Sequence, residues 1–113
     1  MNFKILYNRL ASIDSKELEA RIQGNYNKEI IGYVKDYLAR VIVNPEIAEE
    51  QFITPADIEL VFDVYGINST SKRLSQEALA EKYEVTPSRA AARFAVVVKT
   101  IEREQTKGEE IGL

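Results

Sequence analysis

Residues 74–95 read LSQEALAEKYEVTPSRAAARFA and contain two helix starts, at Ser75 and at Thr86. Serine and threonine are favoured helix caps, and Pro87 follows Thr86 at the first helical position, where its missing N–H costs nothing. A short turn separates the two predicted helices. This stretch therefore has the outline of a helix-turn-helix, in which the second helix would carry the side chains that read DNA bases.

The composition excludes most enzyme chemistry. The 113 residues include no Cys and no His, which rules out thiol nucleophiles, disulfides, zinc fingers and histidine bases. Neither glycine-rich phosphate-binding pattern occurs. The remaining candidates for a magnesium site or an acid–base pair are the carboxylates Glu49, Glu50, Glu59 and Asp63. Acids four residues apart usually form the solvated face of a helix, so we expect no enzyme activity, metal or cofactor.

The chain has the composition of an ordinary globular protein, with 45% apolar and 29% charged residues. No apolar run approaches the roughly 20 residues that span a membrane, and residues 1–15 mix polar with apolar side chains, unlike a secretory signal. We expect a cytoplasmic protein that has no membrane partner.

The first half also predicts helices. Apolar residues recur there at three- and four-residue intervals and favour a short helix: Phe3, Leu6, Leu10 and Ile13. The segment FKILY (3–7) could instead be a strand. Asp14 and Glu17 have capping-box spacing, with Ile13 and Leu18 as a hydrophobic staple, so a second helix should run from there to Gly24.

A longer helix is predicted from Asn27, and Asn44-Pro45 ends it. Its apolar face consists of Ile30, Val34, Tyr37, Leu38 and Val41. Residues 45–53 are expected to form an acidic junction. Thr54, Pro55 and Asp57 then start another helix, which Gly66 ends. Its buried stripe consists of Ile58, Val61, Phe62 and Tyr65.

Residues 68–71 are a polar loop, and Leu74 and Leu79 can staple the helix that Ser75 caps. The final helix should end near Glu104 or Gln105, because Lys107-Gly108 is a plausible stop. Its core face consists of Ala90, Phe94, Val97, Val98 and Ile101. These patterns predict a small all-α protein of five or six helices with a loose tail at 108–113.

Residues 54–105 resemble region 4 of bacterial sigma factors, the segment that contacts RNA polymerase and reads the −35 promoter element. The resemblance rests on a helix ending at Tyr65-Gly66, a polar loop, the pattern S-x-E-x-L-A-E at 75–81, Tyr83, a V-T turn and a final helix with K-T-I-E-R at 99–103. It suggests an isolated region 4, as in small phage and prophage regulators. The implied organisation is a helical interaction or dimerisation module at 1–52, a helix-turn-helix domain at 53–107 and a flexible tail.

The charge distribution agrees with a DNA partner. Residues 72–107 carry eight basic and five acidic side chains, whereas residues 1–71 carry seven basic and eleven acidic ones. Arg89 and Arg93 lie four apart and should both point outward, where arginine can reach guanine edges. Ser88 and Gln76 suit phosphate contacts or are simply preferred near helix starts. The residues expected to contact double-stranded DNA are Lys72, Arg73, Gln76, Thr86, Ser88, Arg89, Ala92, Arg93 and Lys99.

The last two helices also carry unusual residues for this family. Glu84 occupies the turn position that glycine usually holds, so the turn should be strained or differently shaped. Arg93 replaces an apolar residue, and Phe94 is expected to take over its packing. The run AAARFAVVV leaves Ala95 and Val96 on a second apolar face, which predicts a partner surface for another copy or for RNA polymerase. The alanine-rich helix favours an alternative function, an adaptor or inhibitor that binds RNA polymerase or a sigma factor without reading DNA.

Overall fold

The computed structural model describes residues 2–22 and 29–111 of the chain. Within these ranges the protein is all-helical and contains no strand, which confirms the predicted all-α class, but it has seven helices rather than the predicted five or six. The helices are α1 (Phe3–Ala11), α2 (Ser15–Ile22), α3 (Glu29–Val43), α4 (Glu46–Gln51), α5 (Pro55–Tyr65), α6 (Gln76–Tyr83) and α7 (Pro87–Ile111). Because the FKILY segment belongs to α1, the strand alternative is wrong.

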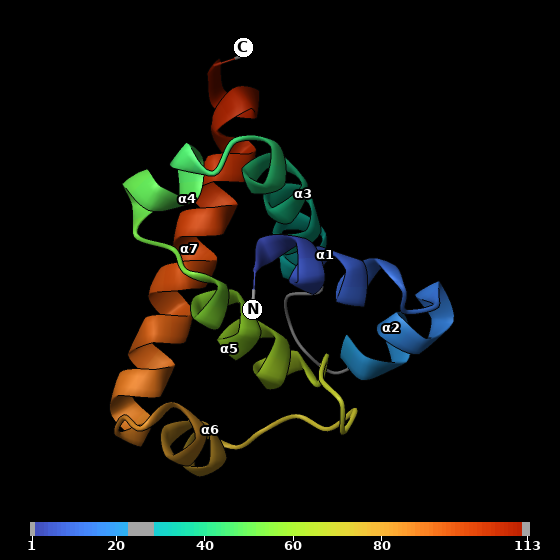
Figure 1. The fold of residues 1–113 in the computed structure, drawn as a ribbon, viewed down its shortest axis with the longest axis vertical. Helices are drawn as coiled ribbons and strands as arrows, with labels where there is room; N and C mark the ends of the chain where they lie inside the picture. Colours follow the sequence, from blue (N-terminus) through green and yellow to red (C-terminus); the bar gives the residue numbers. More distant parts are fainter. Residues whose placement is uncertain (1, 23–28, 112–113) are drawn as a thin grey trace.

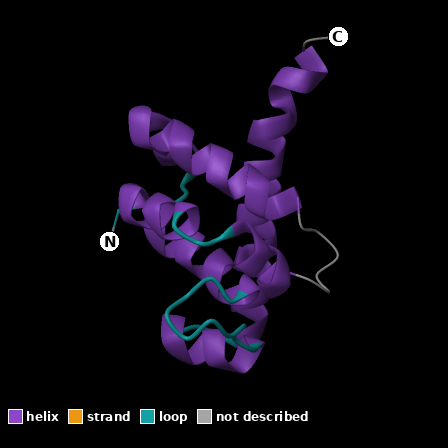
Figure 2. Ribbon diagram, turned by 90° about the vertical axis from the view of Figure 1, so that its right-hand side faces the viewer, coloured by secondary structure: helices purple, strands orange, loops and turns teal. Residues whose placement is uncertain are grey.

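The long helix α7 is the element around which the others are arranged (Figure 1). Helices α3 and α5 pack along it, α6 packs at its N-terminal end, and α1 covers α3 and α5. The last turns of α7 project beyond the other helices (Figure 2). None of the described helices has the length and apolar character required to cross a membrane.

The main hydrophobic core contains side chains from both sides of the predicted module boundary at residues 52 and 53. Leu6, Tyr37 and Leu38 from the first part pack in the same cluster as Val97 and Ile101 of α7. The predicted apolar face of α3 is buried throughout. A smaller cluster of Leu60, Leu79 and Ala90 joins α5, α6 and α7. Phe94 packs against both clusters, which agrees with the prediction that it takes over the packing of the apolar residue replaced by Arg93.

The predicted helix starts at Thr54, Ser75 and Thr86 are confirmed. Thr54 and Asp57 form a reciprocal capping box, in which the Thr54 hydroxyl accepts from the Asp57 N–H and the Asp57 carboxylate accepts from the Thr54 N–H. The Ser75 hydroxyl accepts from the Ala78 N–H at 3.1 Å, and the Thr86 hydroxyl accepts from the Arg89 N–H at 3.2 Å. Gly66 ends α5 in the left-handed conformation, at φ 77°.

The first half contains one further confirmed start and two positions that the structure does not cover. The Asp14 carboxylate accepts from the Lys16 N–H at 3.2 Å, and α2 begins at Ser15. Ile13 and Leu18, the residues of the predicted staple, both pack against the main core. The predicted helix end at Gly24 and start at Asn27 lie outside the described residues.

Two predicted boundaries are wrong. The predicted acidic junction at 45–53 contains a helix of its own, α4, and α7 continues to Ile111 instead of ending near Gln105. Contacts with α3 and α4 hold the second half of α7, because Glu104 pairs with Arg40 at 3.2 Å and accepts from Gln51 at 3.0 Å. Gly108 is tolerated inside the helix, since an interior glycine costs only about 1 kcal/mol. Residues 108–111 are therefore helical rather than a loose tail.

Candidate nucleic-acid interface

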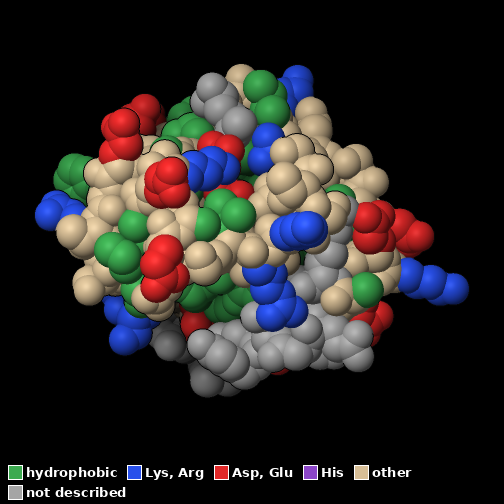
Figure 3. Space-filling view, turned by 90° about the horizontal axis from the view of Figure 1, so that it is seen from below, with side chains coloured by type: hydrophobic (Ala, Val, Ile, Leu, Met, Phe, Trp, Pro, Cys, Tyr) green, Lys and Arg blue, Asp and Glu red, His purple; other side chains and the backbone are tan. Residues whose placement is uncertain are grey.

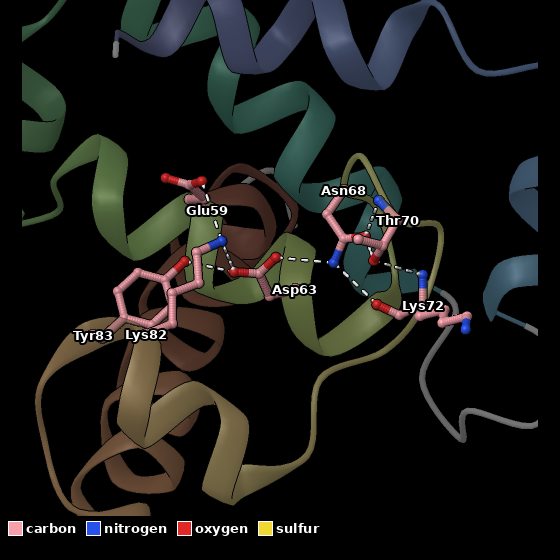
Figure 4. Close-up of polar contacts among 7 residues, drawn as sticks. All are labelled: Glu59, Asp63, Asn68, Thr70, Lys72, Lys82 and Tyr83. Carbon is pink, nitrogen blue, oxygen red and sulfur yellow. Dashed lines mark hydrogen bonds and ion pairs between the residues drawn. The ribbon is translucent and has the colours of Figure 1, made fainter.

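Asp63 of α5 is the polar centre that holds α6 in place (Figure 4). It is fully buried, and its Oδ2 accepts from Lys82 Nζ and from the Tyr83 hydroxyl, each at 2.7 Å. Its Oδ1 accepts from Asn68 Nδ2 at 3.0 Å, and its backbone carbonyl accepts from the Leu74 N–H at 3.0 Å. One carboxylate therefore connects α5 with the following loop and with the last turn of α6.

The prediction that Glu59 and Asp63 share a solvated helix face is wrong for Asp63. Lys82 and Tyr83 from the last turn of α6 reach the buried Asp63 carboxylate, and with Asn68 they provide three side-chain donors that replace its hydration. Glu59 lies at the edge of the cluster, 3.4 Å from Lys82, and its side chain is 23% exposed. The sequence contained a signal for this burial, because Asp63 interrupts the apolar run Leu60–Tyr65.

The pKa shifts around Asp63 keep its partners in their donating forms. Burial, followed by the hydrogen bond to Asp63, raises the pKa of Tyr83 well above its ordinary value. Burial acts to lower the pKa of Lys82, but the hydrogen bonds and charges of Asp63 and Glu59 outweigh it and raise that pKa. At neutral pH the tyrosine is therefore a neutral donor and the lysine is charged.

The turn between α6 and α7 has the geometry expected from a residue that replaces glycine. Glu84 adopts the left-handed conformation at φ 57° and ψ 45°. The Glu84 and Val85 N–H groups both donate to the Ala80 carbonyl, which closes the end of α6. A side chain in this conformation costs roughly 1 to 2 kcal/mol. The backbone of the turn is thus strained at Glu84, but its N–H groups are hydrogen-bonded.

Most of the predicted contact residues are exposed to solvent. Ser88, Arg89 and Ala92 are exposed, and Lys99 lies further along the same helix and is also exposed. Among the described residues, no acidic side chain pairs with Arg89. Lys72, Arg73 and Gln76, before and at the start of α6, are exposed as well. Figure 3 views the end of the molecule that carries α6, and basic side chains there are interspersed with acidic ones.

The expectation that Arg93 points freely outward beside Arg89 is wrong. Arg93 Nε donates to Asp57 Oδ1 at 2.9 Å, and its Nη2 donates to Asp57 Oδ2 at 2.7 Å and to the Phe52 carbonyl at 2.8 Å. This bidentate pair fastens α7 to the start of α5. Arg93 therefore has a structural role, and its guanidinium is engaged by Asp57 and the Phe52 carbonyl rather than open to a DNA base.

The Asp57–Arg93 pair should make stability depend on acid pH. Burial acts to raise the pKa of Asp57, but hydrogen bonds from Arg93 and Thr54 and the charge of Arg93 outweigh it and lower that pKa. A lowered pKa in the folded state stabilises the protein above the ordinary value of 3.8, and this contribution is lost as pH falls through the folded pKa. Asp57→Asn should therefore destabilise the protein by about 1 kcal/mol at neutral pH.

Thermal unfolding of Asp57→Asn and the parent protein from neutral to acid pH tests this expectation. The difference in midpoint should shrink below pH 3.8. Asp36→Asn is the matched control, because Asp36 is exposed on α3, and its midpoint should follow the parent protein throughout. A constant Asp57→Asn difference across the acid range would contradict the assignment.

An apolar groove runs between the start of α5 and the first turns of α7. It has a volume of about 440 Å³, and its lining includes Leu60, Tyr83, Val85, Ala92 and Val96. Arg89 and Arg93 also line it. Val96 is 52% exposed, and Ala95 beside it is exposed too. The described helices of the first half therefore leave the second apolar face of α7 open.

Comparisons with protein-family models, curated proteins and solved structures find no match for the chain. The structure packs α6 against α7, exposes Arg89 and Ser88, and engages Arg93 with Asp57.

Proposed function

We propose that this protein is a DNA-binding transcription regulator whose α6 and α7 form a helix-turn-helix like region 4 of sigma factors. In this proposal it acts at promoters together with RNA polymerase. The proposed DNA surface comprises Lys72, Arg73, Gln76, Thr86, Ser88, Arg89, Ala92 and Lys99.

The observation that carries the proposal is the exposed first turn of α7. Ser88 and Arg89 lie at a helix N-terminus, where backbone N–H groups and the helix dipole favour phosphate. Arg89 is long enough to reach a base edge in the major groove, and Ala92, one turn later, suits a thymine methyl group. The Asp63 cluster supports the same function, since it fixes α6 against α5 and so orients the start of α7.

A second function is favoured by the apolar groove. An adaptor or inhibitor that binds RNA polymerase or a sigma factor would need an apolar contact surface beside the start of α7, and Ala92 and Val96 provide one. In this alternative the two-helix unit presents the groove and does not read DNA.

Salt dependence of binding to random duplex DNA distinguishes the two functions. Phosphate contacts release counterions, so affinity should fall steeply with salt if the proposed surface binds DNA. Lys99→Ala and Arg89→Ala should each weaken binding, and removing one phosphate contact should reduce the salt slope by about 1. Lys35→Ala on α3 is the matched control, because Lys35 is exposed outside the proposed surface. We expect it to leave the slope unchanged.

Two outcomes would contradict the DNA proposal. One is undetectable binding of the folded protein to duplex DNA at low salt, which would favour the adaptor function. The other is an equal effect of Lys35→Ala and Arg89→Ala, which would show that binding depends on overall charge rather than on the start of α7.

A further inference from the structure

Phe52 is an exposed aromatic side chain in an unfavourable backbone conformation. It is 81% exposed and ends α4 in the left-handed region at φ 58°, a conformation that glycine or asparagine adopts more readily. Neither property stabilises the isolated chain. An outlier of this kind is commonly maintained by a function at that position.

Phe52 lies beside the apolar groove. Its carbonyl accepts a hydrogen bond from Arg93 at 2.8 Å, and Arg93 lines the groove together with Val96. The same side of the molecule therefore carries an exposed aromatic protrusion and an apolar groove. A two-fold interface requires a surface that is complementary to itself, and a protrusion next to a groove meets that requirement.

The charges around these two features are also complementary. Glu49 and Glu50, just before Phe52 on α4, are exposed. Arg89 lines the groove, and its guanidinium pairs with no acidic side chain among the described residues. A phenyl ring that enters the groove of another molecule would bring these glutamates toward that arginine. Opposite charges in this arrangement favour one register of association.

We propose that the apolar groove is the binding site for a second copy of this chain. In the resulting dimer, Phe52 of each protomer fills the groove of the other, and Glu49 and Glu50 face Arg89 of the other protomer. This proposal does not rest on the proposed DNA-binding function. Since Arg89 also belongs to the proposed DNA surface, DNA and the second copy should compete for it. Association is therefore measured without DNA.

Sedimentation equilibrium of the full chain over the micromolar range tests the dimer. The parent protein should show a reversible monomer–dimer equilibrium, and Phe52→Gly should weaken it by at least roughly tenfold, which is about 1.4 kcal/mol. Phe52→Gly should still fold, because glycine suits the left-handed position, and its thermal midpoint in dilute solution should equal or exceed that of the parent protein. Ile5→Gln is the matched control, since Ile5 is 50% exposed on α1 and does not line the groove.

A charge exchange tests the predicted register. Arg89→Glu and the double variant Glu49→Lys/Glu50→Lys should each associate more weakly than the parent protein, because like charges then face each other. An equimolar mixture of the two variants should associate again, since both halves of the mixed interface regain opposite charges.

Three results would overturn the proposal. The first is a parent protein that stays monomeric at every concentration. The second is a dimer that Phe52→Gly weakens no more than Ile5→Gln does. The third is a mixture of the two charge variants that associates no better than either variant alone.

Discussion

Asp63→Ala is expected to destabilise the protein by about 3 kcal/mol, because removing one partner of a buried ion pair leaves the others unsatisfied. The substitution deprives Tyr83 and Asn68 of an acceptor, and it removes the buried partner of Lys82. The Lys82 side chain is 41% exposed and can regain water, which limits the loss. Thermal unfolding followed by circular dichroism should show a fall in midpoint on the order of 10 °C.

Glu59→Ala is the matched control, because Glu59 lies one turn earlier on α5 and also contacts Lys82. This ion pair lies at the surface, so its loss should cost no more than about 1 kcal/mol. Tyr83→Phe should have an intermediate effect, since it removes one hydrogen bond to Asp63. If Asp63→Ala were no more destabilising than Glu59→Ala, the Asp63 cluster would not be what holds α6 against α5.

Val97→Glu is expected to have the second large effect and to unfold the protein. Val97 is fully buried in the main core, where an unpaired carboxylate costs several kcal/mol, against a total stability of roughly 5 to 15 kcal/mol for a domain. The neighbouring substitution Val96→Glu should change stability by no more than about 0.5 kcal/mol, because Val96 is 52% exposed. Helical circular dichroism and the thermal midpoint, measured in dilute solution, separate the two variants.

This pair of substitutions tests the orientation of α7. Val96→Glu should retain the helical signal while weakening association through the apolar groove, which Val96 lines. A Val96→Glu protein that is as unfolded as Val97→Glu would mean that the second apolar face is part of the core.

The helix starts were predictable because their chemistry is local. The caps at Thr54, Ser75 and Thr86 each bond to a backbone N–H three residues further along the chain, so a short stretch of sequence contains all the partners. The buried faces of α3 and α7 were predictable for a related reason. Apolar residues at helical spacing must be covered by something, whichever helix provides the cover.

The same reasoning could predict the proposed DNA surface only in part. Helix periodicity places Arg89 and Arg93 on one side of α7, but it contains no information about the helix that lies opposite. Asp57 approaches Arg93 across 36 residues of sequence and engages it, whereas Arg89 stays exposed. The position of α5 therefore decided which of the two arginines is available to a partner.

The sequence by itself determined that the described chain is helical, where α5, α6 and α7 begin, and which of their faces are apolar. Tertiary structure decided the burial of Asp63, whose partner Lys82 is 19 residues away, and the engagement of Arg93 by Asp57. The physical reason is the same in each case. A cap or an apolar stripe is completed within a few turns of one helix, whereas a buried carboxylate or an engaged arginine depends on partners that distant segments supply after the chain has folded.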